Sequence, residues 1–154
     1  MDKLYFEDLR PGEVVEYGDR QVTAAEIVEF AQEFDPQPFH LDQDAGRASM
    51  AGGLIASGWH TAAMLMRINC DEFVNRSSSQ GGPGVDEVNW LRPVRPGDWL
   101  RVRRTTLSAR VSKSRPSLGL VEFLFELFNQ ADEIVMTQKN SMFLGRRPGS
   151  GEAP

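Results

Sequence analysis

The chain has few of the residues that build disulfide frameworks or thiolate metal sites. Cys70 is its single cysteine, and there are 2 histidines among 154 residues. One cysteine excludes an internal disulfide and a thiolate-rich metal site, and it suits a reducing compartment. The first residues lack the apolar core of a signal peptide, and no apolar run reaches the ~20 residues that span a bilayer. We therefore expect a cytoplasmic protein that does not enter a membrane and binds no metal.

Positive charge is also scarce. The 17 Lys and Arg residues stand against 22 Asp and Glu residues, which gives a formal net charge of −5. A general nucleic-acid binder needs an excess of Lys and Arg to neutralise phosphates, so the net charge argues against this class of protein. A local basic group can still meet an anionic small ligand. Arg110, Lys113 and Arg115 flank one expected loop and are candidates for that contact, with solvated surface charge as the alternative interpretation.

The length and the apolar fraction predict one domain with one core. Of the 154 residues, 40% are hydrophobic, which is ordinary for a globular domain of this size. Residues 147–154 are rich in Gly and Pro and contain nothing to bury. We expect a single domain over residues 1–146 that is followed by a flexible tail.

Two helices are expected, at different depths in the fold. "TAAE" at residues 23–26 is a capping box, and apolar residues follow at helical spacing, which predicts a helix over residues 24–34. Pro36 ends this helix, because the residue before a proline avoids helical geometry. Ser57 is the expected N-cap of a second helix from Trp59 to Val74. This helix is apolar on most sides and is therefore expected to be wrapped by other structure.

The remaining segments are β-prone and are separated by short turns. Successive strands with short gaps indicate an antiparallel sheet. Such a sheet and one long buried helix predict an α+β fold in which a curved antiparallel sheet wraps around the helix. The strands are expected at residues 13–22, 85–94, 98–111, 118–128 and 133–144.

The segment "FDPQPFHLD", residues 34–42, carries the first candidate for chemistry. It places Asp35 and His40 five positions apart on a chain that two prolines stiffen. A carboxylate and an imidazole can share general acid–base work, and positional stiffness favours such work. The residues alone leave open the alternative that Asp35 closes a turn and that His40 is a half-buried, hydrogen-bonded histidine.

The second candidate is "IASGWH", where the buried helix is expected to begin. Unpaired N–H groups and a partial positive charge at a helix N-terminus favour an oxygen that gains negative charge. Gly58 would let a ligand come close to the backbone. The alternative is a simple N-cap at Ser57 with Gly58 chosen for packing, and the absence of a G-x-S-x-G pattern argues against a serine nucleophile. His60 is expected in the core or at an interface, and Met64 as core filler or as a pocket residue.

Four segments together resemble the MaoC-like dehydratases, a family that includes the (R)-specific enoyl-CoA hydratases. They are "FAQEFDPQPFHLD", "MAGGLIASGWHT", "NWLRPVRPGDWLRV" and "SKSRPSLGLV", and they are spread over nearly the whole chain apart from the tail. The family pattern runs from Asp through Asn, Pro and an apolar residue to His and then to an acidic residue. Here it reads Asp35, Gln37, Pro38, Phe39, His40 and Asp42, with Gln37 where Asn is usual.

The resemblance implies a hot-dog fold and a specific reaction. The expected assembly is a homodimer, or a higher homo-oligomer, with sheets joined side by side and acyl-thioester tunnels near the subunit interface. The expected activity is reversible syn hydration of a trans-2-enoyl-CoA to an (R)-3-hydroxyacyl-CoA. No cofactor is implied, because CoA enters as part of the acyl-CoA substrate. The rivals are an acyl-CoA thioesterase on the same fold and a non-catalytic acyl-CoA-binding protein.

The resemblance also implies roles for particular residues. Asp35 would orient and activate the water, and His40 would exchange a proton with the α carbon of the substrate. The N–H of Gly58 would bind the thioester oxygen, and Ser57 would support the site by hydrogen bonding. The residues expected to contact the substrate are Phe39, Ile55, Trp59 and Arg115.

Overall fold

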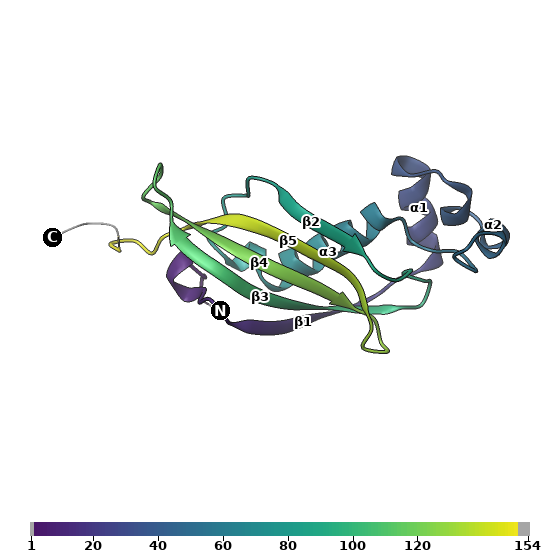
Figure 1. Ribbon diagram of the computed structural model, residues 1–154, viewed down its shortest axis with the longest axis horizontal. Coiled ribbons are helices and arrows are strands. Elements are labelled where there is room, and N and C mark those ends of the chain that lie inside the picture. The colour runs from purple at the N-terminus through teal and green to yellow at the C-terminus, as the bar shows by residue number, and fades with distance from the viewer. Residues whose placement is uncertain (1, 151–154) are drawn as a thin grey trace.

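A curved sheet of five antiparallel strands forms the body of the computed structural model, which describes residues 2–150 (Figure 1). The strands follow the order β1-β3-β4-β5-β2 across the sheet. β1 and β2 are therefore its two edges. The strand bounds are β1 Val14–Gln21, β2 Val85–Trp90, β3 Trp99–Val111, β4 Leu118–Phe128 and β5 Ile134–Gly145.

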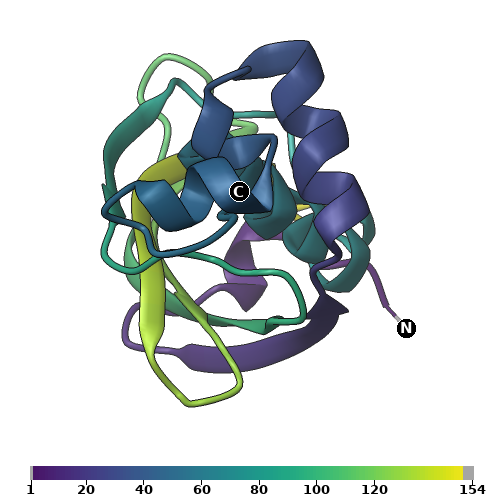
Figure 2. The ribbon, with the colours of Figure 1, turned by 90° about the vertical axis from the view of Figure 1, so that its right-hand side faces the viewer.

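Across the same described residues, three α-helices accompany the sheet. The longest, α3 (Gly58–Glu72), lies against the sheet, which curls around it, while α1 (Ala24–Phe34) and α2 (Gln43–Ala48) gather at one end of the molecule (Figures 1 and 2). None of the helices in this part of the chain has the length and hydrophobicity to cross a membrane. Single turns of 3-10 helix lie at η1 (Phe6–Asp8), η2 (Pro38–His40) and η3 (Val74–Arg76).

The core lies between the inner face of the sheet and α3. Alternate residues of β4 point inward and are at most 1% exposed, namely Val121, Phe123, Phe125 and Leu127. α3 contributes Met64, Leu65 and Ile68 to the same hydrophobic cluster. Burial of each such side chain stabilises the fold by about 1.5–3 kcal/mol relative to exposure. The predicted α+β arrangement, a curved antiparallel sheet around a central helix, is confirmed.

The two predicted helices form close to their expected bounds. Thr23 Oγ1 accepts from the Glu26 N–H at 3.2 Å and donates to the Glu26 carboxylate, so α1 starts at the predicted capping box. Asp35 is the C-cap residue of α1, next to Pro36. α3 begins at Gly58 and ends at Glu72, with Phe73 as its C-cap residue, and Val74, the last residue of the predicted helix, belongs to η3.

The strand predicted over residues 85–94 ends early, at Trp90. The N–H groups of Leu91 and Arg92 both donate to the Val135 carbonyl, and Pro93 has no N–H to continue a ladder. Residues 91–94 therefore leave the sheet. The Val94 carbonyl accepts from the Ala56 N–H at 2.9 Å, which ties this segment to the chain just before α3.

The predicted tail, residues 147–154, is described as far as residue 150. Arg147 forms an ion pair with Asp8 at 2.6 Å, and its backbone N–H donates to the Glu7 carboxylate at 2.9 Å. Residues 151–154 lie outside the described residues. The domain boundary at residue 146 stays a prediction.

Candidate active site

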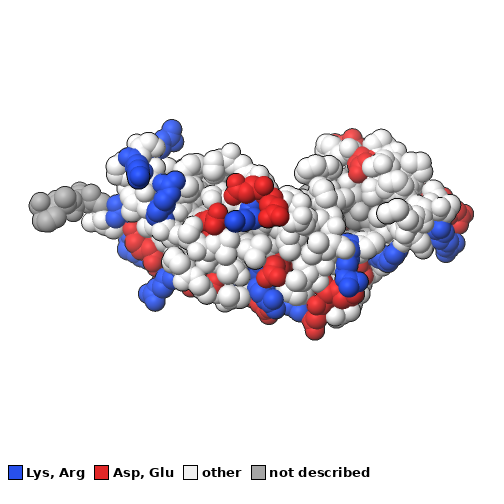
Figure 3. All heavy atoms as spheres, in the orientation of Figure 1, with Lys and Arg blue, Asp and Glu red and all other residues white. Residues whose placement is uncertain are grey.

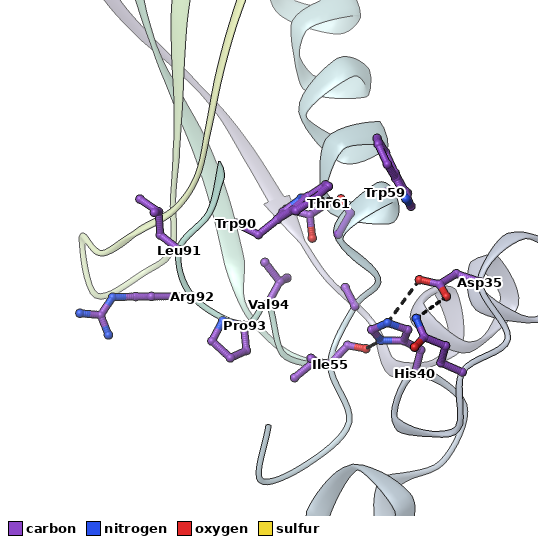
Figure 4. Close-up of a pocket in the computed structure, with 13 residues that line it drawn as sticks. Asp35, His40, Ile55, Trp59, Thr61, Trp90, Leu91, Arg92, Pro93 and Val94 are labelled. Atoms are coloured by element: carbon purple, nitrogen blue, oxygen red, sulfur yellow. Dashed lines mark hydrogen bonds and ion pairs between the residues drawn. The ribbon is translucent and has the colours of Figure 1, made fainter. Parts of the chain in front are cut away.

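A pocket of about 400 Å³ opens where the N-terminus of α3 meets η2 and the segment that follows β2 (Figure 4). Residues 90–94 form one wall, and the other wall includes Asp35, His40, Ile55 and Trp59. The surface between β2 and α1 is hollowed and carries mostly uncharged atoms on the face drawn in Figure 3. The fold thus gathers segments that lie far apart in the sequence around one cavity.

Asp35 is held at the end of α1 by two hydrogen bonds. Ser57 Oγ donates to Asp35 Oδ2 at 2.6 Å, and Gln37 Nε2 donates to Asp35 Oδ1 at 2.7 Å. The Ser57 hydroxyl is the main cause that lowers the pKa of Asp35, burial opposes it, and Gln37 and the nearby His40 lower the pKa further. Asp35 is therefore a carboxylate at neutral pH. Gln37, which stands where Asn is usual, uses its side-chain amide to hydrogen-bond the Asp35 carboxylate.

His40 is oriented from behind by the carbonyl of Ile55. Its Nδ1 lies 2.8 Å from Ile55 O, and because a carbonyl only accepts, Nδ1 carries a proton. The other ring nitrogen, Nε2, lies 3.4 Å from Asp35 Oδ2 (Figure 4). Pro38 stands at the start of η2, where its fixed φ stiffens the connection. The ring therefore presents one exchangeable nitrogen to the carboxylate beside the cavity.

The N-terminus of α3 is the third part of the site. Ser57 is the predicted N-cap, since its Oγ accepts from the Trp59 N–H at 3.3 Å. Ser57 is 0% exposed and does not line the pocket, so its hydroxyl serves Asp35. Gly58 lines the pocket, and within residues 2–150 no acceptor bonds its N–H. One donor thus stays available at the positive end of the buried helix.

The glycine at position 58 has a packing role, which is the alternative that the sequence left open. A Cβ at this position would lie 2.6 Å from Cε2 of Trp90, well inside van der Waals contact. The Trp90 Nε1–H also donates to the Gly58 carbonyl at 2.9 Å. The space that a side chain would take is filled by an indole ring of the same chain. Glycine at this position therefore admits the Trp90 ring, and the expectation that a ligand also comes close to its backbone stays a prediction.

Of the four residues expected to contact the substrate, Ile55 and Trp59 line the pocket and the other two do not. Phe39 packs edge-on against His40, with ring centroids 4.5 Å apart, and so supports the imidazole from outside the cavity. Arg115 is exposed in the β3–β4 turn, at the opposite end of the sheet from α1 (Figure 1). Phe39 and Arg115 therefore lie outside this pocket, and their contact with a substrate stays a prediction.

The second histidine lies in the core, as predicted. His60 is 6% exposed, stacks on Phe30 with centroids 4.8 Å apart and lies 3.6 Å from the Glu26 carboxylate. Burial is the main cause that lowers the pKa of His60, although Glu26 acts in the opposite direction. Met64 is 2% exposed, so of the two alternatives, core residue and pocket residue, the structure shows a core residue.

Most residues of one pocket wall were not predicted from the sequence. Thr61 and residues 90–94 line the pocket, yet the latter were expected to belong to a strand. Two prolines in "RPVRPGD" were the available signal that the strand stops before this segment. As for metal ions, no group of three or more His, Cys, Asp or Glu side chains comes together anywhere in residues 2–150.

Comparisons with known proteins agree with this geometry. The sequence model of the MaoC like domain matches residues 7–119, well over half of the chain. The chain belongs to the MaoC-like dehydratase family. This MaoC-like chain is 43% identical to the MaoC-like dehydratase from Rhodospirillum rubrum, and the two structures agree with a TM-score of 0.87 over 94% of this chain and 99% of that one.

Two more distant proteins are also similar to the MaoC-like chain, one in sequence and one in structure. The uncharacterized protein YdeM from Bacillus subtilis is 27% identical over 135 residues, which cover 88% of this chain and 94% of YdeM. The R-hydratase PhaJ1 from Pseudomonas aeruginosa is 21% identical, with a TM-score of 0.75 over 99% of this chain and 94% of that one. This likeness concerns the fold, which is the hot-dog fold that the sequence predicted.

Proposed function

We propose that this protein is a hydro-lyase that adds water reversibly and in a syn manner to a trans-2-enoyl-CoA, forming an (R)-3-hydroxyacyl-CoA. The observation that carries the proposal is the 3.4 Å approach of Asp35 Oδ2 and His40 Nε2 beside the pocket of about 400 Å³. A single water molecule can hydrogen-bond to both groups at once. Membership of the dehydratase family and the R-hydratase activity named for PhaJ1 support the reaction class.

The proton transfers that the reaction needs can be divided between Asp35 and His40. The cycle requires Asp35 as a carboxylate and a proton on each ring nitrogen of His40, with the Nδ1–H bonded to the Ile55 carbonyl. The water oxygen bonds to C3 while one of its protons passes to Asp35, and His40 Nε2 donates a proton to C2 as the C2–C3 π bond breaks. The proton on Asp35 then returns to His40 across the short gap. Because both groups act from the same side of the substrate, addition is syn.

The low pKa of Asp35 has a consequence for this scheme. A strongly hydrogen-bonded carboxylate is a weak base, so it holds the water as an acceptor before it takes the proton. The electron demand of the conjugated thioester must then drive C3–O bond formation. The Gly58 N–H at the start of α3 would stabilise the thioester oxygen as enolate character develops. No cofactor is needed for these steps, because the thioester itself accepts the electrons.

A homodimer is part of the proposal. The β2 edge of the sheet has no strand partner within the described chain, and Val85 at its start is 53% exposed. Trp59 and Met66 on α3 and Trp90 on β2 are also large, apolar and 45% to 63% exposed. An unpaired edge flanked by exposed apolar side chains favours association with a second copy.

The test of the activity follows two signals in one sample. Purified protein is incubated with crotonyl-CoA and with longer, branched and dicarboxylic enoyl-CoA thioesters, while enoyl absorbance and free thiol are both recorded. Loss of enoyl absorbance without free thiol is the expected result. Release of thiol would instead identify the thioesterase. Saturable binding without turnover of any substrate would identify an acyl-CoA-binding protein and overturn the proposal.

A further inference from the structure

We propose that Trp90 is a positioning residue, which fixes the Gly58 amide as the hydrogen-bond donor to the thioester oxygen. This inference rests on the proposed hydration reaction. It starts from a contact that joins the end of an edge strand to the first residue of the buried helix. Trp90 is the last residue of β2, and its side chain crosses from the strand toward the first turn of α3 (Figure 4).

Two contacts hold Gly58 against the indole. The Nε1–H of Trp90 donates to the Gly58 carbonyl oxygen at 2.9 Å. The ring itself packs on the Gly58 α carbon, because Cε2, Cδ2 and Nε1 would all lie within 2.6 to 2.9 Å of a Cβ at this position. The α carbon and the carbonyl of one residue are thus constrained by one side chain.

Such a constraint matters because the residue is a glycine at a helix terminus. Glycine has the widest choice of φ and ψ, and the first N–H groups of a helix have no intrahelical acceptor to hold them. An oxyanion donor must lie about 2.7–3.1 Å from the developing charge, so a small rotation of the Ser57–Gly58 peptide, which carries this N–H, loses the interaction. Trp90 limits that rotation, because it holds the α carbon and the carbonyl of the residue that carries the N–H.

The surroundings show that this contact belongs to the pocket and not to the core. Trp90 is 45% exposed, and it meets Trp59 edge-on with centroids 5.2 Å apart. Beyond Trp90, the chain is tied to the entry of α3 again by the bond from the Ala56 N–H to the Val94 carbonyl at 2.9 Å. The wall that sequence inspection missed is therefore attached at two points to the segment that presents the Gly58 amide.

The kinetic test compares two tryptophans under the same substitution. Trp90→Phe keeps an aromatic ring but removes the N–H, and we expect kcat for crotonyl-CoA to fall about fivefold to tenfold while KM changes less than about twofold. Trp99→Phe is the matched control, since Trp99 is similarly exposed at 43% and does not line the pocket. Chromatography checks that both variants keep the size of the wild type. Equal kcat for the two variants would overturn the positioning role.

A stability cycle tests the same contact without any assay of activity. Alanine at a helix position without a positive φ is ordinarily neutral or stabilising relative to glycine. In the wild-type background Gly58→Ala must displace the indole, so we expect its melting temperature to fall by about 5 °C or more. In a Trp90→Ala background, the same change should be neutral or stabilising. A loss of equal size in both backgrounds would show that the ring does not constrain Gly58.

The two tests separate the inference from the proposed function. If the wild-type protein hydrates no enoyl-CoA, the proposed function fails and the kinetic role of Trp90 fails with it, although the stability cycle still reports whether the contact exists. If the wild-type protein is active but Trp90→Phe matches Trp99→Phe, the hydratase assignment stands and the inference about Trp90 alone is refuted.

Discussion

The hydroxyl of Ser57 lies 2.6 Å from Oδ2 of Asp35, and this bond joins the start of α3 to the end of α1. It connects the two helix termini that carry the candidate chemistry. The same serine caps α3 through the Trp59 N–H, so the position of the carboxylate and the start of the buried helix depend on one side chain. The site is therefore rigid through its attachment to the core and not only through the prolines beside His40.

Removal of either acid–base group should abolish most of the turnover. Asp35→Asn and His40→Ala are each expected to lower kcat for enoyl-CoA hydration by about a hundredfold or more, the usual loss for a general acid–base group. Asp44→Asn is the matched control, because the Asp44 side chain is 87% exposed and lies in α2 outside the pocket. Circular dichroism confirms folding. Near-native turnover by Asp35→Asn would contradict the assignment.

The acidic limb of the pH–rate profile should report Asp35. The Ser57 hydroxyl is the main cause that lowers the pKa of this carboxyl, so Ser57→Ala raises the pKa. Because the ionised form of Asp35 is the active one, the acidic limb of kcat/KM is expected to move to higher pH. Ser49→Ala, which removes a serine hydroxyl that bonds the Gly46 carbonyl, serves as the control. An unmoved limb in Ser57→Ala would show that another group controls it.

Burial of His60 should make the fold less stable in mild acid. In the unfolded chain this histidine takes up a proton at about pH 6.5, whereas burial lowers its pKa in the folded state. The unfolded state therefore binds the proton first, and the free energy of unfolding decreases as the pH falls through this range. Urea titrations at about pH 7.5 and 5.5 should show a smaller decrease for His60→Gln than for the wild type. An identical decrease would exclude His60 as its source.

The proposed dimer should dissociate when a charge is placed on one sheet edge but not on the other. Val85 on β2 and Val14 on β1 are nearly equally exposed, at 53% and 55%. Exposed apolar side chains accompany β2, whereas Glu16 on β1 forms ion pairs with arginines of β3. Light scattering after size-exclusion chromatography should therefore give a monomer for Val85→Glu and a dimer for Val14→Glu. A monomeric wild type would refute the proposed dimer.

Asp35 and His40 could be predicted as catalytic candidates from the sequence, because the features that point to them lie within a few residues of each other. The capping box before Ile27, the proline after Asp35 and the stiff link to His40 all act within a few residues, where chain geometry leaves little choice. α3 was likewise predicted from a run that is apolar on most sides after a possible N-cap, and the strands from β-prone runs between short turns. These elements lie within a few residues of their predicted bounds.

Contacts between residues that lie far apart in the sequence could not be predicted in this way. The ring of Trp90 occupies the space beside Gly58, which lies 32 positions earlier in the chain. Arg115 belongs to one of the segments that carry the resemblance, and yet it stands at the far end of the sheet from α1. Phe39 is next to His40 in sequence, but its ring packs behind the imidazole and not in the cavity.

The amino-acid sequence by itself determined the helix that ends just before Asp35, the spacing from Asp35 to His40 and the architecture of a sheet around a helix. Only the tertiary structure decided which side chains meet: Ser57 with Asp35, the Ile55 carbonyl with His40 and Trp90 with Gly58. The physical reason is that helix and strand preferences act between near neighbours. The partner of a hydrogen bond or a ring contact is chosen by how separate segments pack, and no local pattern records that choice.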